Sequence, residues 1–122
     1  MIKVVFYKCG NEYYGFRETG HAEFDDEGKD IVCSAISAMS MLVINTIEVS
    51  YGVDVDVDVD EKTADLKVVV KEALKKYSKD EKKRYAISGL LEGYFIQLND
   101  MLEEYYDYMD VDEEEKDIED VL

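Results

Sequence analysis

Residues 30–47 read DIVCSAISAMSMLVINTI, and no charged side chain follows Asp30 in this stretch. Its apolar side chains recur at intervals of three and four, which is typical of an α-helix. Asp is a preferred N-cap residue, so we expect Ile31 to be the first helical residue and Cys33 the third. The stretch is short for a membrane span and contains several polar side chains. It therefore predicts a core helix that is covered on most sides.

The residues before this helix predict two strands and a loop. Ile2, Val4 and Phe6 alternate with Lys3, Val5 and Tyr7, which predicts a strand. A turn at residues 9–12 leads into a second, aromatic-rich strand over residues 13–18. Residues 19–30 contain two glycines and five acidic residues without an apolar period. They predict a loop between the second strand and the helix.

The residues after the helix predict a hairpin and a second helix. Valine alternates with aspartate over residues 53–60, which favours a strand with one buried and one solvated face, and residues 66–70 form the return strand. A long amphipathic helix is expected from about Lys79. The order ββαββα predicts an α+β domain, with a small antiparallel sheet and two helices packed on it. We expect this domain to span residues 1–109, followed by an acidic C-terminal tail, 110–122, that frays.

Charge and cysteine content exclude several classes of protein. The 122 residues include 30 acidic and 14 basic ones, for a net charge of −16. Such a surface repels phosphates, so we predict no nucleic-acid partner and no membrane partner, and a cationic partner is favoured. The two cysteines do not make a disulfide scaffold, and the N-terminus lacks the apolar run of a signal peptide. A reducing cytoplasm is the expected location.

One cysteine and the single histidine form a candidate catalytic pair. Cys33 is expected in the first turn of a helix, where unpaired N–H groups favour a thiolate and can stabilise an oxyanion. His21 lies on the loop before it and could take the thiol proton. The alternative is that Cys33 is a small core residue and His21 a surface residue. Cys9 ends a strand, so a structural role is expected for it.

No metal or cofactor is predicted. The aspartates at positions 54, 56, 58 and 60 alternate along one strand, so they cannot wrap around a calcium ion, and no EF-hand loop is present. One histidine and two distant cysteines do not have the spacing of a zinc site.

Two motifs resemble those of a known family. The sequences GHA at residues 20–22 and GKDIVCSAIS at residues 28–37 are similar to the signature of the ribosomal-processing cysteine protease Prp family, and the similarity extends over roughly the first 105 residues. Ser34 stands where the family often has alanine or glycine. The resemblance implies that Cys33 and His21 are the catalytic pair and that the intervening loop closes over the substrate.

The resemblance also implies a substrate and an assembly. Family members remove an N-terminal extension from large-subunit ribosomal protein twenty-seven by cleaving after an aromatic residue, and they are homodimers. Tyrosines outside the main apolar stripe of the second helix would suit a dimer interface, namely Tyr85, Tyr94, Tyr105, Tyr106 and Tyr108. A second functional hypothesis is a non-enzymatic acidic module that binds a basic ribosomal partner.

Residues near the pair are assigned to substrate binding. They are Gly20, Ala22, Asp30, Ser34 and Ser37. Asp30 could also orient His21 as a third catalytic member, although its expected role as the N-cap competes with this.

Overall fold

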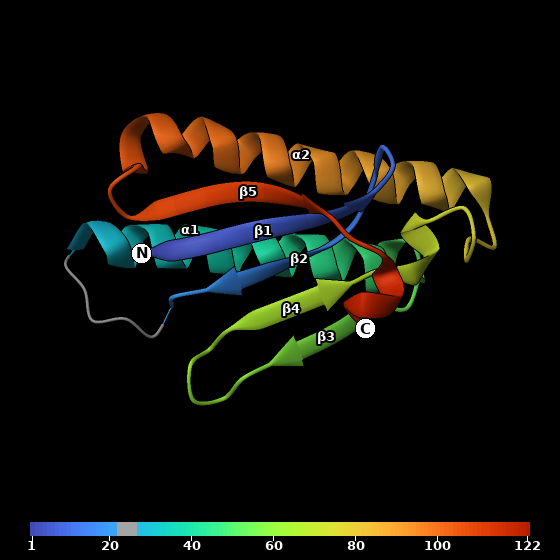
Figure 1. Ribbon diagram of the computed structural model, residues 1–122, viewed down its shortest axis with the longest axis horizontal. Helices are drawn as coiled ribbons and strands as arrows, with labels where there is room; N and C mark the ends of the chain where they lie inside the picture. Colours follow the sequence, from blue (N-terminus) through green and yellow to red (C-terminus); the bar gives the residue numbers. More distant parts are fainter. Residues whose placement is uncertain (22–26) are drawn as a thin grey trace.

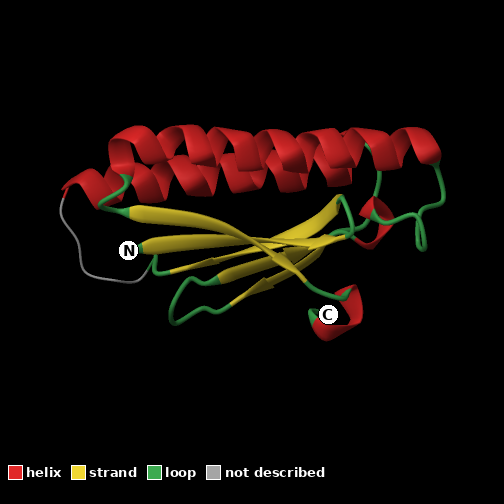
Figure 2. Cartoon of the chain, turned by 45° about the horizontal axis from the view of Figure 1, so that its top comes forward, coloured by secondary structure: helices red, strands yellow, loops and turns green. Residues whose placement is uncertain are grey.

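Two long helices lie side by side over one face of a five-stranded sheet (Figures 1 and 2). The computed structural model describes residues 1–21 and 27–122. The strands and helices in chain order are β1 Ile2–Cys9, β2 Glu12–Thr19, α1 Glu27–Asn45, β3 Asp56–Val59, β4 Leu66–Val69, α2 Glu81–Tyr105 and β5 Met109–Glu115. Short helical turns are η1 Thr46–Ser50, η2 Lys71–Ala73 and η3 Ile118–Asp120. The predicted α+β class and the placement of both helices on one sheet are confirmed.

The sheet is mixed, whereas an antiparallel sheet was predicted. Its strand order is β3-β4-β2-β1-β5, and β5 runs parallel to β1 with Ile2 opposite Met109. The other three neighbouring pairs are antiparallel. The element order is therefore ββαββαβ, because the chain returns to the sheet after α2.

The acidic C-terminal segment is part of the domain, so the expectation of a fraying tail from residue 110 is wrong. Met109 is buried, and Lys8 Nζ donates to Glu113 at 2.9 Å. The Gly10 amide donates to Glu115 at 2.6 Å. The acidic side chains of β5 are mostly exposed at the sheet edge, where water solvates them while the backbone pairs with β1. The many acidic side chains do not prevent this pairing, because their carboxylates point away from the backbone hydrogen bonds between β5 and β1.

The core lies between the sheet and the two helices. Alternate residues of β1 are fully buried, as strand geometry requires. The Phe6 ring lies 5.6 Å from Phe16 on β2 and 5.5 Å from Tyr94 on α2. The buried residues of the helices include Val32, Ile36, Val43, Ile87, Leu91 and Leu98. Tyr94 was predicted to lie on an uncovered surface, but it is buried in this core.

Helix α1 is covered on one side only, so the prediction that it is covered on most sides is wrong. Val32 and Ile36 face the core, whereas Leu42 is 61% exposed and Ile31 is 50% exposed. The segment Gly28–Ser50 is long and apolar enough to cross a membrane. Core helices of globular domains also have this composition, and α1 packs in the core layer beside α2 (Figure 2).

The β3–β4 hairpin extends to the edge of the sheet. Val57 and Val59 were predicted to be buried, but both are exposed. The reason is that β3 is the outermost strand, so only one neighbouring strand lies beside it. Val59 instead lines a hollow beside α1, which is described next.

Candidate active site

His21 and Cys33 line the same hollow. It has a volume of about 390 Å³ and lies between the end of β2, one face of α1 and the β3–β4 hairpin. The lining residues are Glu18, His21, Cys33, Ser37, Ser40, Met41, Val59, Ala64 and Leu66. The fold therefore brings together the two residues that the sequence singled out for cysteine chemistry.

The conformation of Gly20 and one side-chain contact hold His21 close to the end of β2. Gly20 has φ +92°, a conformation that glycine adopts without the penalty of a side chain. The His21 Nε2 atom lies 3.3 Å from Glu18 Oε2, and the His21 side chain is only 10% exposed. The ring is thus fixed on one side by a carboxylate while it borders the hollow.

Cys33 lies in the second turn of α1, so its predicted place in the first turn is wrong. The helix begins at Glu27, which makes Cys33 its seventh residue, and Asp30 is a helical residue rather than the N-cap. A Cβ on Gly28 would lie 2.5 Å from the ring of Tyr108, so glycine allows this extra turn to pack closely against the turn between α2 and β5. This tertiary contact outweighs the capping preference of Asp30.

The longer helix changes how the thiol can be activated. The first turn of the helix comprises residues 27–30, one turn before Cys33. A thiolate at Cys33 therefore gains less from the helix N-terminus than the sequence suggested. His21 borders the same hollow and is a candidate proton acceptor for the thiol.

The predicted substrate-binding residues are only partly brought together. Ser37 lies one turn after Cys33 and lines the hollow. Ser34 and Asp30 are exposed on α1 and are not among the lining residues. Gly20 shapes the chain before His21 but does not line the hollow either. Ala22 lies outside the described residues.

A buried polar cluster beside His21 was missed by the sequence reasoning. Glu18 is 1% exposed, and its Oε1 accepts hydrogen bonds from the Ser40 hydroxyl and, at 2.9 Å, from the Tyr94 hydroxyl. The Ser40 and Tyr94 hydroxyls are 2.7 Å apart. The available signal was the strand alternation, because Glu18 and Phe16 share the face of β2 that the helices cover.

The far wall of the hollow is apolar. Met41 comes from α1, and Val59 and Leu66 come from the β3–β4 hairpin. Ala64 completes this wall and has φ +62°, a left-handed conformation in the turn that joins the two strands. The hollow thus combines a polar end, at the thiol and imidazole, with an apolar end that can receive a hydrophobic side chain.

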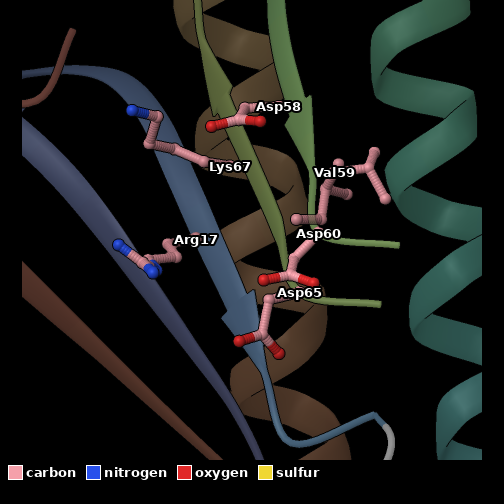
Figure 3. Close-up of a pocket in the computed structure, with 7 residues that line it drawn as sticks. Arg17, Asp58, Val59, Asp60, Asp65 and Lys67 are labelled. Atoms are coloured by element: carbon pink, nitrogen blue, oxygen red, sulfur yellow. The ribbon is translucent and has the colours of Figure 1, made fainter. Parts of the chain in front are cut away.

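A second hollow, of about 370 Å³, lies on the β2, β3 and β4 strands (Figure 3). Arg17, Lys67 and Asp58 occupy neighbouring register positions across the three strands. Asp60 and Asp65 lie beside them. This hollow has charges of both signs and is lined by neither cysteine nor histidine.

Within residues 1–21 and 27–122, no group of three or more His, Cys, Asp or Glu side chains could hold a metal ion.

A thiol and an imidazole on one small α+β scaffold, beside a hollow with an apolar wall, define a cysteine hydrolase as the class to test. The sequence matches the family model described as cysteine protease Prp over residues 1–110. The chain therefore belongs to the Prp family of ribosomal-processing cysteine proteases.

Relatives agree with this assignment. The chain is 28% identical over 96 residues to the ribosomal processing cysteine protease Prp of Bacillus subtilis (strain 168), a match covering 79% of this chain and 81% of the relative. The crystal structure of SMU.848 from Streptococcus mutans has a TM-score of 0.77 at 24% identity, covering 95% of this chain and 99% of that one. Prp from S. aureus with a substrate peptide has a TM-score of 0.76 at 18% identity, covering 93% and 100%. The two structures show the same fold.

Proposed function

We propose that Cys33 is the nucleophile and His21 the general base of this cysteine protease. The observation that carries the proposal is that both side chains line one hollow. His21 takes the thiol proton, and the thiolate attacks the scissile carbonyl to form a tetrahedral intermediate. The intermediate collapses to a thioester as the amine leaves with the proton from His21. Water then hydrolyses the thioester with the same ring as base, which regenerates the thiol and releases the acid product.

The proposed substrate is the precursor of large-subunit ribosomal protein twenty-seven, cleaved after an aromatic residue of its N-terminal extension. Three features support this. The family processes ribosomal protein, and one S. aureus Prp structure holds a covalently linked product peptide. The wall formed by Met41, Val59 and Leu66 offers an aromatic ring the apolar contact it needs. The net charge of −16 attracts a basic protein.

Two substitutions test the catalytic pair. Cys33→Ala should abolish cleavage of a peptide that spans the extension, because it removes the thiol that forms the thioester. His21→Ala should lower the rate by about a hundredfold to ten-thousandfold, the usual contribution of a positioned acid–base group. Mass spectrometry of the products locates the cut. Normal turnover by Cys33→Ala would disprove the protease mechanism, and a cut away from aromatic residues would disprove the proposed specificity.

We also propose that the chain is a cytoplasmic homodimer, as the family resemblance implies. The outer side of the two helices supports a self-contact, because Met39, Leu42, Leu90 and Gly93 border an apolar hollow between α1 and α2. Tyr85 is 84% exposed at the start of α2. Light scattering across a salt series tests the assembly, since apolar contact persists when salt screens the repulsion between two acidic chains. A monomer at every salt concentration would disprove the dimer.

A further inference from the structure

A buried carboxylate stands directly behind His21. Glu18 is 1% exposed, and its Oε2 lies 3.3 Å from His21 Nε2. We propose that Glu18 is a positioning residue that fixes the tautomer and the orientation of the His21 ring. This inference rests on the proposed function, because it assigns Glu18 a role only if His21 is the base.

The carboxylate is itself held in place from both helices. Ser40 on α1 and Tyr94 on α2 both direct their hydroxyls at Glu18 Oε1. Burial raises the pKa of the Tyr94 phenol, and the nearby Glu18 charge raises it further. The phenol therefore keeps its proton at neutral pH and remains a donor. With Oε1 held in this way, the other carboxylate oxygen, Oε2, faces the imidazole.

The hydrogen-bonding capacity of the groups then sets the tautomer. A carboxylate only accepts hydrogen bonds, so the Nε2 atom that faces Glu18 must carry the proton. A neutral imidazole has a single N–H, and Nδ1 is consequently the atom with the lone pair. Nδ1 becomes the base that takes the thiol proton, and the imidazolium that forms faces the negative charge of Glu18. The tautomer and the charge both favour the reaction.

The position of Glu18 also argues against a purely structural role. Phe16 precedes it on the same covered face of β2, where an apolar residue would pack without the cost of burying a charge. The two hydroxyls and the imidazole provide hydrogen-bonding partners for the carboxylate and lower this cost. A carboxylate within hydrogen-bond distance of an imidazole that borders the same hollow as a thiol has the geometry of a group that orients a catalytic base.

Glu18→Leu and Glu18→Gln test the inference. Leu removes the charge and every acceptor, whereas Gln keeps the shape and one acceptor oxygen but removes the charge. We expect kcat to fall about a hundredfold for Glu18→Leu, the cost of a misplaced reacting group, and less for Glu18→Gln, with KM changed by less than about threefold in both. Glu12→Gln is the matched control. It alters a carboxylate at the other end of β2, one that pairs with Arg84 at 2.5 Å, and should leave kcat unchanged.

The single histidine gives a second readout that a merely structural role would not move. Nitrogen NMR of the ring should show the Nε2–H tautomer in the wild-type chain and a mixture of tautomers in Glu18→Leu. Tyr94→Phe keeps the carboxylate and should retain the wild-type tautomer. Glu18→Gln keeps the shape of the side chain, so it remains informative if Glu18→Leu does not fold. An unchanged tautomer and kcat in a folded Glu18→Leu or Glu18→Gln variant, with cleavage still abolished by Cys33→Ala, would overturn the role of Glu18 alone. Retained cleavage in Cys33→Ala would instead overturn the proposed function.

Discussion

Gly20→Ala should displace the histidine of the site. Gly20 joins the end of β2 to His21 and has φ +92°. A Cβ at this position would lie 2.1 Å from the backbone carbonyl oxygen of Met1 and 3.3 Å from Ile2 Cα. Both obstacles are backbone atoms at the start of β1, so no side-chain rotation can remove the clash. The chain before His21 must move instead.

The geometry gives the size of this movement. A Cβ atom essentially never approaches another heavy atom closer than 3.0 Å, so the backbone must shift by about 0.9 Å. A displacement of about 1 Å at a reacting group can cost a hundredfold in rate. The positive φ adds roughly 1–2 kcal/mol of strain for a residue with a side chain. We therefore expect kcat/KM to fall about a hundredfold, with a loss of at least about 1 kcal/mol in the free energy of unfolding.

Gly10→Ala is the matched control for Gly20→Ala. Gly10 has a similar φ of +64° in the turn between β1 and β2, but a Cβ there would meet no atom within 4 Å. It should lose stability through backbone strain and keep full activity. The assay is the cleavage rate of a quenched fluorescent peptide, with urea unfolding of both variants. Activity within twofold of wild type in Gly20→Ala, or an equal loss of activity in Gly10→Ala, would refute this reasoning.

Two further predictions concern β5. Met109→Ala should lower the free energy of unfolding in urea by about 2–5 kcal/mol, because Met109 is buried. Asp110→Ala on the same strand should have little effect. Equal effects of the two substitutions would show that β5 does not pack against the core. Hydrogen bonds from Tyr13 and then Lys8 lower the pKa of Glu113, so its stabilising contribution is present above the unfolded-state pKa and is lost as pH falls through the folded-state pKa. Glu113→Gln should therefore lower the free energy of unfolding at neutral pH. Its free energy of unfolding, measured in urea, should also fall less than that of the wild type between pH 7 and about pH 3. The same pH dependence in both proteins would contradict this prediction.

Periodicity predicted most of the regular structure. The three-and-four spacing of α1 and α2 and the alternation in β1 are local patterns that reflect which face is buried. The start of α1 could not be predicted in this way. Asp30 has the chemistry of an N-cap, but the extra turn before it packs Gly28 against Tyr108, a residue far along the chain. A contact over that sequence distance leaves no trace in local spacing.

Strand β5 could not be predicted from local patterns either, but for a different reason. Its residues are mostly acidic, and such composition is typical of solvated segments. The strand forms because its backbone pairs with β1 and because Met109 enters the core. An edge strand needs only one covered face and one partner, so the remaining side chains are free to carry charge.

The sequence predicted those members of the site whose chemistry is evident from the residue type alone. A lone histidine shortly before a cysteine is visible in the sequence, and the structure places both in one hollow. Glu18, Ser40 and Tyr94 come from a strand and two helices, and Tyr94 is 76 positions from Glu18. Each of the three looks ordinary in its own segment. Their joint role depends on the packing of α1 and α2 over β2.

The beginnings of β1 and β5 support both sides of the candidate pair. Gly20, just before His21, lies against the backbone of Met1, and Gly28, in the turn before Cys33, lies against the ring of Tyr108. The amide of Ile2 donates to the carbonyl of Tyr108 at 2.9 Å, which joins these two supports. The parallel pairing of β5 with β1 then continues from this bond. The acidic C-terminal strand is therefore linked to both supports, because its pairing with β1 joins Tyr108, whose ring meets Gly28, to the start of the chain, whose backbone meets Gly20.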